Sequence, residues 1–152
     1  MNKSLILILF VVDYIWLKSS FGKLTEGKFV GSLAPTLTKF ASNNPYPPVK
    51  DFLQNIAIPN SQTFAYLTMW GETFVTVALL VSALFLFFST KVNKLMLLLL
   101  VPALFVGMLL NLVFWLSSGW VSSAADGLNM LMFVVEVVGL FLAVRILVKK
   151  PK

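Results

Sequence analysis

The chain has 152 residues, enough for one compact domain, and apolar side chains dominate its composition. Hydrophobic residues make up 59% and charged residues 12%, whereas soluble domains carry about 25% charged residues. With a mean hydropathy of +0.90, this composition excludes an ordinary soluble domain and indicates an integral membrane protein. Because the sequence contains no cysteine and no histidine, we expect no haem, no thiolate metal site and no other metal centre.

The net charge of +6 invites comparison with nucleic-acid-binding proteins, but the basic residues are spread along the chain. They lie between and beyond apolar segments, as at Lys91, Lys94, Lys149, Lys150 and Lys152. This placement is typical of topology determinants and of contacts with anionic lipid. We therefore expect the lipid bilayer as a partner and no nucleic acid.

Four apolar segments are each close to or above the ~20 residues that a helix needs to cross the hydrocarbon core. They cover residues 4–20, 61–88, 96–116 and 128–148. Only helices or closed barrels span lipid, and these segments lack the alternation of barrel strands. The sequence therefore predicts an all-α integral membrane four-helix bundle, in which residues 1–152 form a single transmembrane domain.

The first segment also has features of a secretory signal, since Lys3 precedes an apolar stretch. However, Asp13, Trp16 and Lys18 follow that stretch, and no cleavage site with small residues is evident. We expect a retained helix.

Basic residues in short loops favour the cytoplasmic side of a membrane. Four crossings place Lys3, Lys94 and Arg145 on one side, while the short gap 117–126 has no basic residue. We therefore expect a multi-pass protein of the cytoplasmic membrane with both termini in the cytoplasm. Five lysines assigned to the long first loop count against this orientation, although long loops weaken the rule. They are Lys18, Lys23, Lys28, Lys39 and Lys50.

Residues 21–60 form the long first loop, in which two short amphipathic helices are predicted. Apolar residues recur at helical spacing over 30–40, where Pro35 is expected to bend the helix, and again over 49–56. Asn60 is suited to cap the second span. Such helices either lie at the interface as a collar or fold over the outer mouth as a lid, and the sequence leaves both alternatives open.

Five polar residues lie inside the predicted spans: Asp13, Glu72, Asn111, Asn129 and Glu136. With alternating helix directions, most of this set converges on one outward-facing depth, which is the pattern expected of a site. Amides often simply hydrogen-bond between helices, and we favour that interpretation for both asparagines. Carboxylates at membrane depth are costly, so both glutamates are better candidates for pairing, protonation or function.

The tryptophans at positions 16, 70, 115 and 120 fall near predicted outer boundaries, where an aromatic belt is normal. We favour the belt. The alternative is that Trp70 and Phe114 wall a cavity for a flat ring.

A set of short motifs occurs in collinear order: Trp16-Leu17, Gly22-Lys23-Leu24, Pro59-Asn60, Trp70-Gly71-Glu72 and Asn111-Leu112-Val113-Phe114. This set resembles the DoxX/DoxD family over roughly residues 14–130. The family consists of small four-helix membrane proteins of bacteria and archaea, some of which are similar to the small subunit of thiosulfate:quinone oxidoreductase. Asp13 and Glu136 do not belong to the family's pattern.

The resemblance implies a membrane subunit of a quinone-linked redox system, with quinone as the cofactor. Glu72 would handle protons with Lys23 as its partner, and these two are the expected catalytic residues. Because the chain offers no one-electron centre, a redox partner subunit would be needed. The expected cofactor-binding residues are Trp70 against the ring, Asn111 as a donor to a carbonyl, Asn60 and Phe114.

Two alternatives remain open. In the first, the chain is a non-catalytic anchor or assembly subunit whose polar cluster only fixes helix packing. In the second, it is a small transporter or channel, which would require a homo-oligomer because four helices with few charges make a poor pore.

Overall fold

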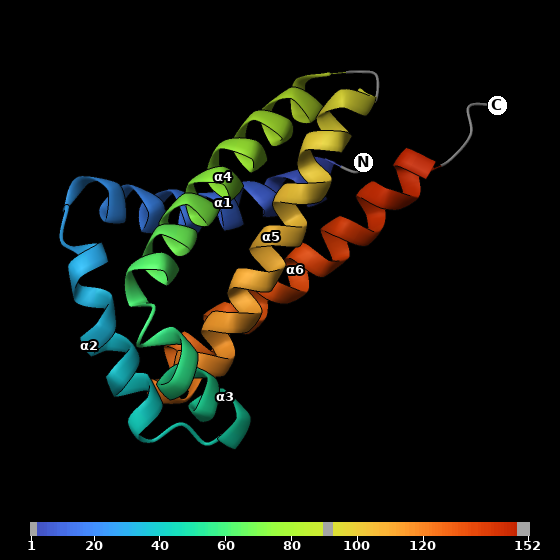
Figure 1. The fold of residues 1–152 in the computed structure, drawn as a ribbon. Helices are drawn as coiled ribbons and strands as arrows, with labels where there is room; N and C mark the ends of the chain where they lie inside the picture. The colour runs from blue at the N-terminus through green and yellow to red at the C-terminus, as the bar shows by residue number, and fades with distance from the viewer. Residues whose placement is uncertain (1–2, 90–92, 149–152) are drawn as a thin grey trace.

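A computed structural model describes residues 3–89 and 93–148 (Figure 1). Regular structure in these ranges is entirely helical, so the all-α prediction is confirmed. The helices are, in chain order, α1 Lys3–Thr25, α2 Phe29–Ser42, α3 Pro47–Phe52, the π-helical turn η1 Leu53–Ala57, α4 Ser61–Phe88, α5 Lys94–Ser118, the 3₁₀ turn η2 Gly119–Val121 and α6 Ser123–Val148.

Within the described ranges, α1, α4, α5 and α6 are long and apolar enough to cross a membrane, as predicted. The second span has the predicted bounds, but the first continues to Thr25 instead of ending at residue 20. The prediction ended that span at the polar residues Ser19 and Ser20. Ser20 is buried instead, with its hydroxyl 3.2 Å from that of Thr76 on α4, so the pair does not end the helix. Lys18 and Lys23 therefore belong to α1 and not to the first loop.

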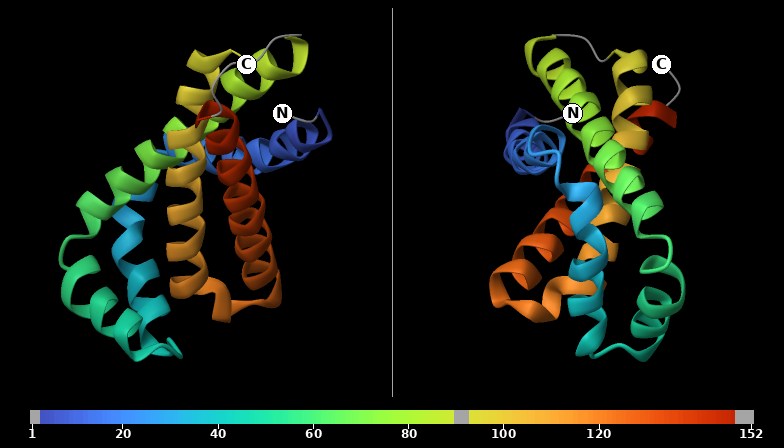
Figure 2. Two further views of the ribbon diagram at one scale, coloured as in Figure 1. Left: turned by 90° about the vertical axis from the view of Figure 1, so that its right-hand side faces the viewer. Right: turned by 60° about the vertical axis from the view of Figure 1, so that its left-hand side comes forward.

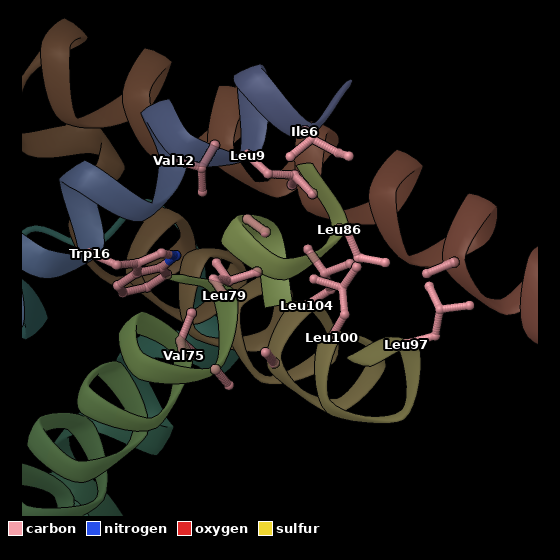
Figure 3. Packing of buried hydrophobic residues seen from close by; sticks show 14 of the residues in the cluster. Ile6, Leu9, Val12, Trp16, Val75, Leu79, Leu86, Leu97, Leu100 and Leu104 are labelled. Atoms are coloured by element: carbon pink, nitrogen blue, oxygen red, sulfur yellow. The ribbon is translucent and has the colours of Figure 1, made fainter. Parts of the chain in front are cut away.

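The core forms where α1 packs on α4, α4 on α5 and α5 on α6. Figure 3 shows Ile6, Leu9, Val12 and Trp16 projecting from one side of α1 into this cluster. The opposite side of α1 is exposed, as expected for a helix surrounded by lipid.

The molecule has two distinct ends, visible in both views of Figure 2. At one, called the lid end here, lie α2, α3, η1 and η2. The described ends of α1 and α6, Lys3 and Val148, lie toward the opposite end, where α4 is followed by α5. In these views α1 runs at a steep angle across the other three long helices. The lysines at 91, 149, 150 and 152, used for the predicted orientation, lie outside the described residues.

The predicted amphipathic helices of the first loop are present as α2 and as the continuous segment formed by α3 and η1. We call residues 29–57 the lid. The lid has its own small core of Leu37, Ala41, Leu53 and Ala57, and α2 packs along α4. Pro35 lies inside α2 without ending it.

A buried amide hydrogen-bonds the lid to the bundle. Asn44, 8% exposed, donates to the backbone carbonyls of Leu116 and Ser117 at 3.2 Å each, and accepts from the backbone N–H of Tyr46 at 3.0 Å. These carbonyls belong to the last turn of α5, where the helix leaves acceptors unpaired.

The turn from α1 into the lid depends on Gly27, which has φ +64°. An L-residue with a Cβ pays roughly 1–2 kcal/mol in this left-handed region, and asparagine less than others. We expect Gly27→Ala to lower the free energy of unfolding by about 1 kcal/mol, with Gly27→Asn in between. Thermal unfolding in detergent measures this. Equal stability of Gly27→Ala and the unaltered chain would show that the turn tolerates another backbone conformation.

Candidate functional site

Glu72 is the twelfth of the 28 residues of α4, well inside the span, and its side chain is fully buried. It lies on the face of α4 that also buries Val75, Thr76 and Leu79, and that face packs against α1. A carboxylate in this position requires a partner from the neighbouring helix.

That partner is Lys23 of α1. Its Nζ lies 2.7 Å from Glu72 Oε2 and 3.0 Å from Oε1. Ser19, one turn earlier on α1, donates to Glu72 Oε2 at 3.0 Å and accepts from Lys23 Nζ at 2.7 Å. The pairing of Lys23 with Glu72 expected from the sequence is therefore present as a closed network between α1 and α4.

The two charges differ in accessibility. Glu72 has no exposed area, whereas the Lys23 side chain is 19% exposed. The ammonium also lies 5.1 Å from the ring centroid of Phe29, the first residue of α2, within the range of a cation–π contact. Lys23 therefore stands between the buried carboxylate and the lid, so an arriving molecule meets the lysine first.

A cavity of about 470 Å³ lies beside this network, between the lid and the bundle. The lid contributes mainly apolar and aromatic side chains: Phe29, Leu33, Thr36, Leu37, Phe40, Phe52, Leu53 and Ala57. The bundle contributes the polar groups and further aromatic rings: Ser19, Lys23, Phe64, Thr68, Glu72, Val113, Phe114, Ser117, Ser118 and Asn129.

The volume and character of the cavity are those of a small-molecule site. Such sites measure about 300–1,000 Å³ and combine apolar walls with a few placed polar groups. Here the Lys23–Ser19–Glu72 network is the charged part of a lining that is otherwise uncharged and mainly apolar. The arrangement suits a flat, largely apolar ligand with a hydrogen-bond acceptor.

A second polar cluster lies deeper in the bundle. Glu136 of α6 is fully buried and accepts two hydrogen bonds, from Trp16 Nε1 on α1 at 2.8 Å and from Asn111 Nδ2 on α5 at 2.7 Å. The expected single outward-facing cluster is thus two clusters. The interpretation of Trp16 as a belt residue is wrong, since it is 2% exposed.

The remaining predicted cofactor-binding residues differ in their placement. Asn111 is bonded to Glu136 and does not line the cavity. Trp70 is 58% exposed and lies outside it, and Asn60 donates to the carbonyl of Ile56 at 2.8 Å. Only Phe114 lines the cavity, where its ring also packs on that of Trp16 at 6.3 Å.

Sequence reasoning missed Ser19, Phe29 and Asn129 as cavity residues. Ser19 had a local signal, since it lies four residues before Lys23 and therefore on the same helical face. Asn129 was expected to bond between helices, but its amide donates to the carbonyl of Ala125 in its own helix at 2.8 Å.

No group of three acidic or other metal-ligating side chains occurs in ranges 3–89 and 93–148. The chain was compared with known protein families, with curated proteins and with solved structures, and none of them matched. Fold and cavity together define a multi-pass helical membrane protein with a lidded cavity beside a buried ion pair.

Proposed function

We propose that the chain is the membrane subunit of a quinone-linked redox system and that it binds a quinone headgroup in the cavity under the lid. The observation that carries the proposal is the meeting of an apolar, aromatic cavity with the Lys23–Glu72 pair. The resemblance of the Gly22-Lys23 and Trp70-Gly71-Glu72 motifs to the DoxX/DoxD family supports the same proposal.

When bound, a quinone supplies a couple that takes up two electrons and two protons to give the quinol. Lys23, as the accessible member of the pair, donates a hydrogen bond to a ring carbonyl. Glu72 would hold the ammonium in place, and the pair would pass protons from the accessible Lys23 side to the carbonyl oxygens. Phe114 and the lid phenylalanines pack on the ring. The electrons come from a partner subunit with a redox cofactor.

We also propose in which membrane the chain lies and how it is oriented there. The chain lies in the cytoplasmic membrane of a bacterium or archaeon, with both termini in the cytoplasm and the lid on the outer face. The basic residues near the shorter connections support this orientation, as does the common end shared by the described ends of α1 and α6.

Binding of a decyl-substituted benzoquinone to the purified chain in lipid nanodiscs tests the proposal. Thr68 lines the cavity, so we expect Thr68→Phe to fill part of it and to weaken binding by about ten-fold, or 1.4 kcal/mol. Thr63→Phe, on an exposed face of the same helix, is the matched control and should bind normally. Glu72→Gln should also weaken binding. Absence of binding, or binding indifferent to Glu72→Gln and Thr68→Phe, would rule the proposal out.

The second candidate is a non-catalytic anchor or assembly subunit. The bonds of Glu136 to Trp16 and Asn111 favour it, because they join α1, α5 and α6 without any ligand. Under this alternative Glu72→Gln weakens folding or complex formation and no quinone-dependent change accompanies it. Measuring stability and quinone affinity on the same Glu72→Gln sample separates the two candidates.

A further inference from the structure

The proposed quinone site leaves two buried carboxylates without a role. Glu136 has no exposed area, and Asp13 of α1 is 3% exposed. Both lie within the spans. Asp13 lies one helical turn before Trp16, and one turn after Leu9, on the inner face of α1. Trp16 and Leu9 both lie against α6: Trp16 donates a hydrogen bond to Glu136, and a Cβ placed on Gly139 would lie 3.5 Å from Leu9.

The donors around these carboxylates do not neutralise them. Among the described residues, Glu136 accepts hydrogen bonds from Trp16 and Asn111 alone, and both are uncharged. Asp13 Oδ1 is buried and lacks a hydrogen-bond partner in the described part of the chain. Ser82 of α4, the helix packed on α1, is also fully buried, and its hydroxyl is likewise unpartnered.

The described cations of the packed helices are exposed or engaged elsewhere, and Lys18 of α1, Lys94 of α5 and Arg145 of α6 belong to the exposed group. On α1, Lys23 lies ten residues beyond Asp13 and is already paired with Glu72 of α4. Lys3, ten residues before Asp13, lies over the ring of Phe87 at 5.4 Å. The α5 residues that approach Glu136 are uncharged. Asn111 donates to its carboxylate, and Gly107 lies so close that a Cβ there would come within 2.5 Å of Glu136 Oε1.

An isolated ionised carboxylate in an apolar interior is strongly unfavourable, and such groups become neutral instead. A proton satisfies this requirement here better than a metal cation does. Hard cations take about six or more oxygen ligands, whereas both oxygens of Glu136 already face N–H donors. In addition, the residues that the structure describes include no group of three or more Asp and Glu side chains placed to hold a metal ion.

We propose that Glu136 and Asp13 form an intramembrane proton-binding site, distinct from the Lys23–Glu72 pair, that retains at least one proton at neutral pH. Trp16 donates directly to Glu136, so its indole senses the charge on that carboxylate. The inference does not depend on a quinone and is tested on the chain without ligand.

The experiment uses the full chain in nanodiscs with Trp70, Trp115 and Trp120 replaced by phenylalanine, which leaves Trp16 as the reporter. We expect Trp16 emission to change with pH as Glu136 gains or loses its proton. Glu136→Gln should abolish the titration. Asp13→Asn should change the proton affinity by about ten-fold, which is one pH unit.

Infrared spectroscopy of the unaltered chain provides a second measurement if a variant fails to fold. We expect the carbonyl band of a protonated carboxylic acid at neutral pH, retained in Glu72→Gln and diminished in Asp13→Asn. Absence of that band in the unaltered chain, or a Trp16 response to sodium but not to pH, would overturn the proposal. If the chain did not bind quinone but still showed the carboxylic-acid band, the result would count against the proposed quinone function and not against the proton-binding site.

Discussion

Replacing Lys23 with methionine is expected to lower the free energy of unfolding by about 3 kcal/mol, the lower end of the range for breaking a buried pair. Glu72 would remain fully buried with Ser19 as its donor, and Lys23 is the only cation paired with it among the described residues. The lower end applies because the Lys23 side chain is 19% exposed. Thermal unfolding in detergent measures the loss.

The double variant Lys23→Met/Glu72→Gln should recover most of that stability, since it removes the unpaired charge along with its partner. Lys18→Met is the matched control: Lys18 is exposed on the same helix, and surface substitutions stay within about 0.5 kcal/mol. If the double variant were less stable than Lys23→Met alone, the two side chains would not act as a pair.

Gly107→Ala is expected to lower the free energy of unfolding by about 2–3 kcal/mol, toward the upper end for overpacking a filled core. A Cβ at this position would lie 2.5 Å from Glu136 Oε1 and 3.0 Å from Cδ. The carboxylate cannot withdraw freely, because Trp16 and Asn111 hold both of its oxygens. The expected result is a lower unfolding temperature together with a shift in Trp16 fluorescence.

The control for Gly107→Ala is the same substitution at Gly31 of α2, where a Cβ would meet nothing within 4 Å. There alanine should be neutral or stabilise by about 0.5–1 kcal/mol, as in other helix interiors. Similar stability of the two variants would mean that α5 and the Glu136 carboxylate are farther apart than the structure places them.

Local sequence patterns determined much of the architecture. Apart from Glu72, the 28 residues from Ser61 to Phe88 are apolar or uncharged, and they specify a span because lipid offers no partner for an unpaired backbone, so a segment of this length must be helical. The lid helices were also predictable, since apolar residues over 30–40 recur at helical spacing, and prolines bound the next helix. The polar residues were identified as a set for the same reason: each interrupts an apolar run.

How these residues group was decided only by the tertiary structure. Lys23 meets Glu72 from 49 residues away, and Trp16 meets Glu136 from 120 residues away. Apolar side chains cover every side of such spans, because lipid and helix neighbours are equally apolar. The sequence by itself therefore determines which segments cross the membrane and which carry charge. The rotation and neighbours of each helix come from packing, as at Gly107 against Glu136, and packing separates the lidded ion pair from the buried carboxylates.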